Sequence, residues 1–281
     1  MYKSINQWSF PADMRISDMM RQAKELGFDA FEPALSETGE LSLESSDAEI
    51  LAIRDEAKRI GIRLSSLASG LTWGCSPTSN DPAVRQRAHA NAVRQLECAN
   101  LLGVSAILLV PGTVGTGFWG GREDYVYYED AWKRCVEQLK ALAPVAEQCG
   151  VVIGVENVWN NLLVSPKDVL SLLDEVGSPW VQSYLDIGNI VKFGFPEMWV
   201  RMLRGRIVRV HIKDFKRSIG TLDGFCDLLC GDVDFPAVMR ELRDAGYDAD
   251  ITAEMNNTVC CHADNRVARA SAAMDVILGR K

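Results

Sequence analysis

The sequence predicts a single (β/α)8 barrel spanning residues 1–281, and three observations support this fold. Short β-branched runs alternate with longer amphipathic stretches from near the first residue to the last. The length suits eight strand–helix units, because such barrels typically need about 250 residues. Polar side chains also close the last four strand candidates, as expected where the carboxyl ends of barrel strands form a functional mouth.

The strand candidates are short runs in which β-branched residues are frequent. They cover residues 3–9, 29–34, 62–68, 105–110, 151–155, 181–186, 207–212 and 250–254. The helix candidates are longer and amphipathic, and they cover residues 15–26, 47–60, 82–102, 126–149, 166–176, 196–203, 235–245 and 264–278. An open doubly wound sheet is the alternative, but no GxGxxG motif follows the first strand, as its nucleotide-binding version requires.

Both ends of several helices carry sequence signals. Glycine follows five helical runs, where a left-handed C-terminal cap favours it: Gly27, Gly61, Gly103, Gly150 and Gly246. At the other end, Asp81-Pro82 and Ser165-Pro166 each supply an N-cap followed by proline at the first helical position.

Alternation of side chains predicts which face of a strand points into the barrel. In 207–213, His211 and Lys213 share one face, opposite a row of aliphatic residues. The run 250–256 repeats this pattern, with Glu254 on the polar face. A barrel strand packs its outer face against helices, so the polar face is expected to be the inner one.

Four side chains that close strands five to eight are candidate ligands for a divalent cation. They are Glu156 after VVIGV, Asp186 after VQSYL, His211 after RIVRV and Glu254 after DITA, at gaps of 30, 25 and 43 residues. Taken singly, each is more typical of a salt bridge or a packed imidazole. As a set they would meet at one mouth, where three carboxylates without a cation would repel one another and lose solvation. Such oxygen-rich ligands suit a divalent cation.

The runs GVENVWN, YLDIGN, VHIKDF and ITAEMN resemble the xylose-isomerase-like TIM-barrel superfamily, and most of all its sugar (phosphate) isomerase/epimerase branch. That branch includes ketose 3-epimerases and pentulose-phosphate 3-epimerases, and the resemblance runs the full length. It implies one bound divalent cation, Mn²⁺ in the first place and otherwise Co²⁺ or Mg²⁺, held by Glu156, Asp186, His211 and Glu254. It also implies that Glu156 and Glu254 transfer protons through a cis-enediolate of a ketose or ketose phosphate.

Further side chains are candidates for contacts with the substrate: Trp8, Glu32, Trp119, Asn189, Lys213, Arg217 and His262. The two tryptophans suit stacking on a sugar face, although Trp8 is equally consistent with core packing. Glu32 closes the second strand and would hydrogen-bond either the substrate or a ligand. For Lys213, an ion pair with a ligand carboxylate is favoured over a Schiff-base role.

Three of these positions bear on the kind of sugar or on the proton transfer. Asn189 stands where many free-ketose epimerases of the resembling family carry histidine, which favours the phosphate-sugar branch. Arg217 matches a family position that contacts substrate, and with Lys216 it could meet a hydroxyl or a phosphate. His262 would be an additional base if it folds back over the mouth.

Two long connections follow the fourth and seventh strands, at residues 111–124 and 214–234. Long loops in compact domains are usually functional or disordered. The aromatic side chains of Phe118, Trp119 and Phe225 favour a lid or a pocket wall.

The bulk composition excludes some partners. A net charge of −8 argues against nucleic acid and against a membrane surface. No apolar run approaches the roughly 18 residues of a membrane span, and the first residues lack a signal-peptide core, so a cytoplasmic protein is expected. Analogy with other large barrels suggests a homodimer or homotetramer.

Two other functions remain as alternatives to an isomerase or epimerase. A metal-dependent lyase would use the same cation and bases on a keto-sugar derivative. A non-catalytic sugar-binding barrel would use the same mouth without chemistry. A DNA-repair nuclease is disfavoured because it would need more histidine ligands and a basic groove.

Overall fold

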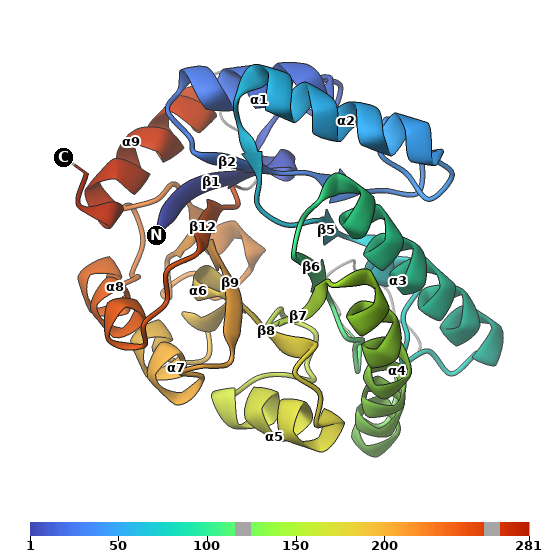
Figure 1. Ribbon diagram of the computed structural model, residues 1–281. Helices are drawn as coiled ribbons and strands as arrows, with labels where there is room; N and C mark the ends of the chain where they lie inside the picture. The colour runs from blue at the N-terminus through green and yellow to red at the C-terminus, as the bar shows by residue number, and fades with distance from the viewer. Residues whose placement is uncertain (116–124, 256–264, 281) are drawn as a thin grey trace.

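A ring of parallel strands forms the centre of the molecule, and helices surround it (Figure 1). The computed structural model describes residues 1–115, 125–255 and 265–280, and within them one sheet has eight strands. In order of pairing these are β4 (Arg63–Leu64), β2 (Ala30–Glu32), β1 (Tyr2–Asn6), β12 (Asp250–Ala253), β9 (Ile207–Ile212), β8 (Val181–Asp186), β7 (Val152–Glu156) and β6 (Ala106–Leu109). The predicted barrel is therefore confirmed, and each of its eight predicted strands overlaps a strand of this sheet.

The third predicted strand, residues 62–68, closes the ring but is divided. Its first part is β4, which pairs with β2. Farther along, the Leu67 amide donates to the carbonyl of Ala106 at 3.1 Å, and Leu67 accepts from the Leu108 amide at 3.0 Å. The segment changes partners along its length, so only short stretches of it are regular strand. Beyond it, β3 (Ala34–Leu35) pairs with β5 (Ala68–Ser69).

The first predicted strand, residues 3–9, is too long. It ends at Asn6, and a 3-10 turn, η1 (Gln7–Ser9), follows. The side chain of Asn6 causes this end, because its Oδ1 accepts a hydrogen bond from the Trp8 amide at 2.7 Å and caps the turn. Trp8 therefore lies in the turn above the strand.

The predicted helices are all present. They are α1 (Ile16–Glu25), α2 (Asp47–Ile60), α3 (Pro82–Leu102), α4 (Tyr128–Cys149), α5 (Pro166–Val176), α7 (Pro196–Met202), α8 (Phe235–Asp244) and α9 (Arg266–Leu278). The structure adds α6 (Ile187–Ile190), a single turn too short to show a helical period. Asp186 caps it, because its Oδ1 accepts from the Asn189 amide at 2.8 Å.

The predicted caps account for several helix ends. Gly61 and Gly103 adopt left-handed conformations with φ of 77° and 76°, which a residue with a Cβ atom adopts at a cost. Ser165 forms a capping box with Asp168, and Asp81 accepts from the amide of Ala83 at 2.8 Å. The helices thus begin and end close to their predicted limits.

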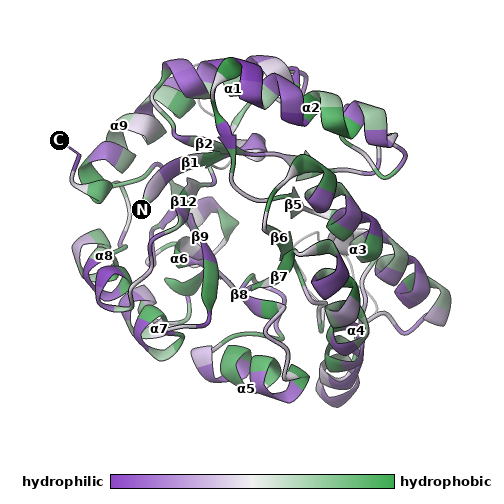
Figure 2. Ribbon diagram, viewed as in Figure 1, coloured by the Kyte–Doolittle hydropathy of each residue, from purple (hydrophilic) through white to green (hydrophobic). Residues whose placement is uncertain are grey.

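The hydrophobic core lies between the ring of helices and the sheet. In Figure 2 the outer helices carry both hydrophobic and hydrophilic residues, as surface helices packed on a core do. A second, smaller cluster fills the inside of the barrel: Ala34, Ala68, Leu108, Val110 and Tyr184. Trp8 is partly buried against this inner cluster.

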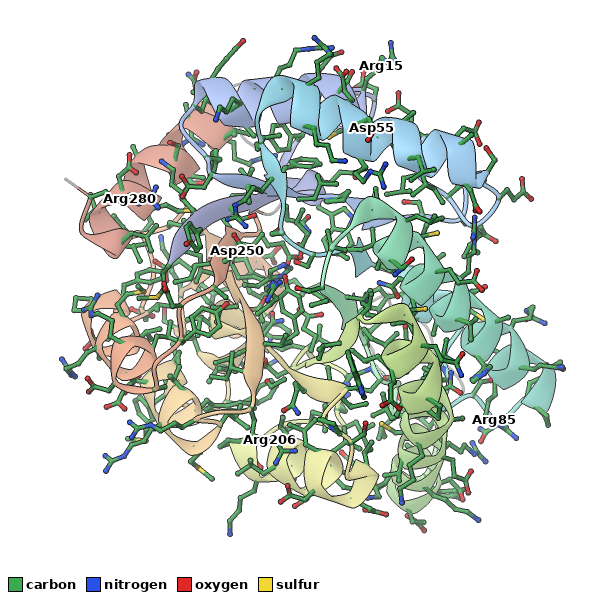
Figure 3. The ribbon with its side chains drawn as sticks, in the orientation of Figure 1. Arg15, Asp55, Arg85, Arg206, Asp250 and Arg280 are labelled. Atoms are coloured by element: carbon green, nitrogen blue, oxygen red, sulfur yellow. The ribbon has the colours of Figure 1, made fainter. Side chains whose placement is uncertain are left out.

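Charged side chains close the amino-terminal end of the barrel. Figure 3 labels Asp250 close to the strands. Asp250, at the start of β12, accepts a hydrogen bond from Arg63 Nη2 at 2.6 Å.

No helix among the described residues is long and apolar enough to span a bilayer.

The connection after β9 is ordered and folds over the other end of the barrel. β10 (Asp214–Phe215) pairs antiparallel with β11 (Phe225–Cys226), and the 3-10 turn η3 (Leu222–Gly224) joins them. The buried carboxylate of Asp214 accepts from the amides of Gly231 and Val233, at 2.8 and 3.2 Å. The connection at residues 111–124 is described only as far as residue 115.

Candidate metal centre

Glu156, Asp186, His211 and Glu254 converge at the carboxyl end of the barrel. Each offers a ligand atom, and these atoms all lie within 4.8 Å of one another. Glu156 and Asp186 end β7 and β8, His211 lies near the end of β9, and Glu254 follows β12. Three of the four residues are buried, and Glu254 is partly exposed.

Strand register explains why these positions meet. Asp186 and His211 are direct partners in the pairing of β8 with β9. The Glu254 amide donates to the carbonyl of Ile212 at 3.0 Å, which places residue 254 beside the end of β9. Because side chains alternate along a strand, this register turns all three side chains into the barrel. The inward orientation inferred from the alternation is thus observed.

Lys213 lies on the same inner face and enters the cluster. Its Nζ is 3.0 Å from Asp186 Oδ2 and 3.0 Å from Glu254 Oε1. Burial would lower the pKa of Lys213, but Asp186, Glu254 and Glu156 together hold it above its ordinary value. Lys213 is therefore a charged partner of the ligand carboxylates, which is the favoured of its two predicted roles.

The two glutamates have pKa values shifted in opposite directions. Burial, together with the negative charge of Glu254, raises the pKa of Glu156 to about 8. Burial acts in the same sense on Glu254, but Lys213 and His211 outweigh it and lower the pKa of Glu254 to about 2. Without a cation, Glu156 therefore favours its protonated form at neutral pH and Glu254 its ionised form.

The residues present fit a divalent cation. Three carboxylates share the one ammonium of Lys213, and burial raises the pKa of Asp186 even with that ammonium beside it. Asp186 Oδ2 is buried, and among the described residues its one close partner is the Lys213 ammonium at 3.0 Å. Three carboxylates and one imidazole form a ligand set that Mn²⁺ and Mg²⁺ accept.

Glu32 is fully buried behind this cluster, at the end of β2. Its Oε2 lies 2.7 Å from His211 Nε2. Burial would raise the pKa of Glu32, but His211 and the hydroxyl groups around the carboxylate lower it. Of the two contacts predicted for Glu32, the structure shows the one with a ligand, and no surface of Glu32 is left for a substrate.

Asn189 and Asn157 hold the ligands from the side of α6. The Asn189 side-chain amide donates to Glu156 Oε1 at 3.3 Å and to the Asn157 carbonyl at 3.2 Å. The side chain of Asn157 accepts from the Asp186 amide and donates to the Asp186 carbonyl, both at 2.8 Å. Asn157 was missed in the sequence analysis, although it directly follows a predicted ligand.

Aromatic rings form one wall beside the centre. Trp159 is buried against Phe225 and Phe215, with ring centroids 5.2 and 5.4 Å away. The ammonium of Lys213 lies 5.4 Å from the ring centroid of Phe225. Phe225, predicted as part of a pocket wall, therefore lines the cluster, whereas nothing in the sequence singled out Trp159.

The remaining candidates lie apart from the four ligands or outside the description. Arg217 is exposed, donates to the carbonyl of Gly194 at 3.1 Å and packs its guanidinium over Phe195. Trp119 and His262 fall outside the described residues.

Comparison with known proteins places this geometry in context. Residues 20–278 match a family model described as "Xylose isomerase-like TIM barrel". The L-ribulose-5-phosphate 3-epimerase UlaE of Escherichia coli (strain SE11) is 28% identical, over 98% of this chain and 93% of the relative. A solved L-ribulose 3-epimerase superposes with a TM-score of 0.82 at 19% identity, covering 99% of this chain and 95% of that one. The D-psicose 3-epimerase of Clostridium cellulolyticum H10, solved with D-tagatose, gives 0.80 at 19% identity and 99% coverage of both chains.

Proposed function

The chain belongs to the xylose isomerase-like TIM barrel family, and from this membership we propose that it is a divalent-metal-dependent 3-epimerase of a ketose phosphate. The observation that carries the proposal is the position of Glu156 and Glu254. Both glutamates belong to one cluster of candidate metal ligands whose atoms lie within 4.8 Å of one another. Two carboxyl groups are therefore available beside any sugar that reaches the cation.

Glu156, Asp186, His211 and Glu254 would hold the cation. When bound, a divalent cation polarises a carbonyl and a neighbouring hydroxyl oxygen, which acidifies the adjacent C–H bond. The ligand set accepts Mn²⁺, Co²⁺ and Mg²⁺ alike. We take Mn²⁺ as the first choice and the other two as alternatives.

Proton transfer is the task of the two glutamates. One carboxylate removes the proton at C3 to form an enediolate, and the other carboxyl group returns a proton on the opposite face. In the metal-free protein the pKa values of Glu156 and Glu254 shift in opposite directions, so the two carboxyl groups lie in different environments. Asn189 holds Glu156, and Lys213 holds Glu254, so each carboxyl group keeps a defined orientation.

Two features favour a phosphorylated substrate. The relatives that share 28% of residues over nearly the whole chain bear the name L-ribulose-5-phosphate 3-epimerase. On the rim, Lys216 and Arg217 are exposed in the connection after β9, where they could meet a phosphate group. Asn189, in place of the histidine expected for free-ketose enzymes, is consistent with the same choice.

Deuterium exchange tests the proposal. The metal-stripped protein is reloaded with Mn²⁺ and incubated in D₂O with L-ribulose 5-phosphate, and the products are followed by NMR. We expect the C3 epimer to appear with deuterium at C3, and unphosphorylated L-ribulose to react more slowly. An unsaturated product would indicate a lyase, and no exchange with any ketose or ketose phosphate would indicate a non-catalytic barrel. The expected homodimer or homotetramer stays a prediction, which light scattering can test.

A further inference from the structure

We infer that Glu32 is a positioning residue that fixes the tautomer and the orientation of the His211 ring. The inference rests on the metal centre proposed above and assigns a role to a carboxylate that does not belong to it. Glu32 acts with three other buried side chains, from Asn6, Ser66 and Tyr184, which together leave it one arrangement.

The two ring nitrogens of His211 face different carboxylates. Nδ1 lies 2.8 Å from Glu254 Oε2, on the side of the ligand cluster. Nε2 lies 2.7 Å from Glu32 Oε2, on the side away from it. A neutral imidazole has one N–H, and an ionised carboxylate can only accept a hydrogen bond. Both neighbours are carboxylates, so these contacts alone do not choose between the two nitrogens. Only Nδ1 lies on the side of the cluster, where a bound cation would need its lone pair, and this leaves the single hydrogen of a neutral ring on Nε2, toward Glu32.

The Glu32 carboxylate is held in place beside the His211 ring, because each of its two oxygens accepts hydrogen bonds from two donors. Oε1 accepts from Ser66 Oγ at 2.5 Å and from the Tyr184 hydroxyl. Oε2 accepts from Asn6 Nδ2 at 2.5 Å as well as from His211. Four donors hold the carboxylate in one rotamer and favour its ionised form.

Asn6 itself can present only a donor to Glu32. Its Oδ1 already accepts from the Trp8 amide at 2.7 Å, so its amide group must face the carboxylate. The same contact ends β1 and starts the following turn. The side chain of Asn6 thus both ends the first strand and helps to hold the carboxylate that contacts His211.

Tyr184 links the network to the barrel core. Its ring packs edge-on against the His211 ring, with centroids 4.7 Å apart and planes at 72°. The space for this ring exists because residue 154 is glycine, since a Cβ atom there would lie 2.8 Å from Tyr184 Cδ2. Tyr184 therefore restrains His211 both directly and through Glu32.

Burial separates this role from substrate binding. Asn6, Glu32, Ser66, Tyr184 and His211 are all completely buried. No sugar can reach Glu32 without disrupting the barrel interior. An influence of Glu32 on the centre has to pass through His211.

Metal affinity and histidine NMR test the inference on the full-length, metal-stripped protein. Glu32→Gln keeps the size of the side chain but removes its charge and one acceptor. We expect it to weaken Mn²⁺ binding in calorimetry by about 10- to 100-fold, the usual effect of losing such a partner. Tyr184→Phe removes one donor only, and we expect a smaller loss.

The NMR readout reports the tautomer directly. At a concentration of diamagnetic Mg²⁺ that just saturates the wild-type protein, the ¹⁵N shifts of its His211 should show hydrogen on Nε2. At the same concentration Glu32→Gln, which binds more weakly, should show a mixture. The chain has only three histidines, so assignment is simple. Should Glu32→Gln fail to fold, Tyr184→Phe keeps the carboxylate and provides the same two measurements.

Ser4→Ala is the matched control. Ser4 Oγ donates to Ser65 Oγ at 3.0 Å, a buried hydrogen bond in the same barrel interior that does not touch Glu32. We expect Ser4→Ala to reduce stability without changing Mn²⁺ affinity or the His211 tautomer. Equal Mn²⁺ affinity in wild type, Glu32→Gln and Tyr184→Phe would overturn the inference, and so would an equal loss in Ser4→Ala. A wild-type protein that binds no divalent cation would instead overturn the proposed metal centre itself.

Discussion

The two ends of the barrel are both lined by charged side chains, but they balance their charges differently. At the amino-terminal end, Arg209 donates to the carbonyls of Ser65 and Val208 and to Ser105 Oγ, and Arg63 pairs with Asp250. At the carboxyl end, three carboxylates face Lys213 and His211, and the pKa of Glu156 rises to about 8.

The same alternation of side chains therefore produces two different ends. We call the amino-terminal end compensated, because its charges have partners, and the carboxyl end uncompensated, because its carboxylates outnumber the ammonium of Lys213. A groove of about 740 Å³ lies at the compensated end, yet its charges already have partners or protein carbonyls. The centre at the carboxyl end is buried, and its three carboxylates outnumber the one ammonium of Lys213. Such an imbalance is costly unless a ligand corrects it, so it identifies the functional end better than cavity size does.

The largest effect should come from removing one proton-transfer group at the uncompensated end. We expect Glu254→Gln to lower kcat by 10²- to 10⁴-fold, the usual contribution of general acid–base catalysis, with the fold retained. NMR gives kcat from the rate of epimer formation, and circular dichroism reports whether the fold is retained. The exposed Glu147 on α4 is the control, and Glu147→Gln should react like wild type. Near-normal turnover of metal-loaded Glu254→Gln would break the comparison.

Metal removal should distinguish the two ends in stability as well as in activity. Chelation should stop turnover, and Mn²⁺ at about 100 times its Kd should restore it and add about 2.7 kcal/mol to the free energy of unfolding. Asp186→Asn should reduce that gain, because it removes a ligand charge. Denaturant melts with and without Mn²⁺ measure this. An equal Mn²⁺ stabilisation in Asp186→Asn would exclude the proposed ligand set.

The pH dependence of the metal-free protein should sharpen the contrast. The pKa of Glu156 is about 8 in the folded state and near 4.3 in an unfolded chain, so the folded protein binds the extra proton between these values. Stability should therefore be greatest at the low end of this window and fall as the pH rises toward 8, by at most about 1.4 kcal/mol per unit. The lowered pKa of Glu254 acts only at more acid pH.

Urea melts between pH 5 and pH 8.5 test this slope. Glu156→Gln should flatten it, since an amide does not titrate, and saturating Mn²⁺ should flatten it as well. A slope that is the same in Glu156→Gln would show that other groups cause it.

The smallest effect is expected at the compensated end. Asp250→Asn weakens the ion pair with Arg63, whose side chain is half exposed, so the loss should be about 1 kcal/mol or less. Turnover and Mn²⁺ affinity should not change, because this pair lies at the opposite end of β12 from Glu254. A fall in turnover of protein that remains fully folded would mean that the two ends are linked.

Much of this fold was predictable because its signals are local. The helix 47–60 is bounded by Ser46 and Gly61, and these caps act within one turn of the chain. The convergence of the candidate ligands was predictable for a related reason. Parallel strands bring their carboxyl ends together whatever lies between them, so Glu156 and Glu254 could be paired across almost a hundred residues.

Two strand limits differ from the prediction, for different reasons. The division of residues 62–68 depends on which strand pairs with which, and no short run of sequence encodes that choice. The end of β1 at Asn6 is local instead, because the Asn6 side chain caps the Trp8 amide. Tyr184 has the inward alternation of Asp186, two positions before it, and that signal could have found it. Its bond to Glu32 joins residues that are far apart in sequence, so no local pattern reveals it.

The sequence by itself determined the strand–helix alternation, the helix caps and the four candidate ligand positions, because propensity and side-chain period act over a few residues. Only the tertiary structure decided the partners of those ligands: Lys213 between two carboxylates, Asn189 on Glu156, and Glu32 behind His211. The reason is physical, since hydrogen bonds and ion pairs depend on distances of about 3 Å that barrel closure alone sets.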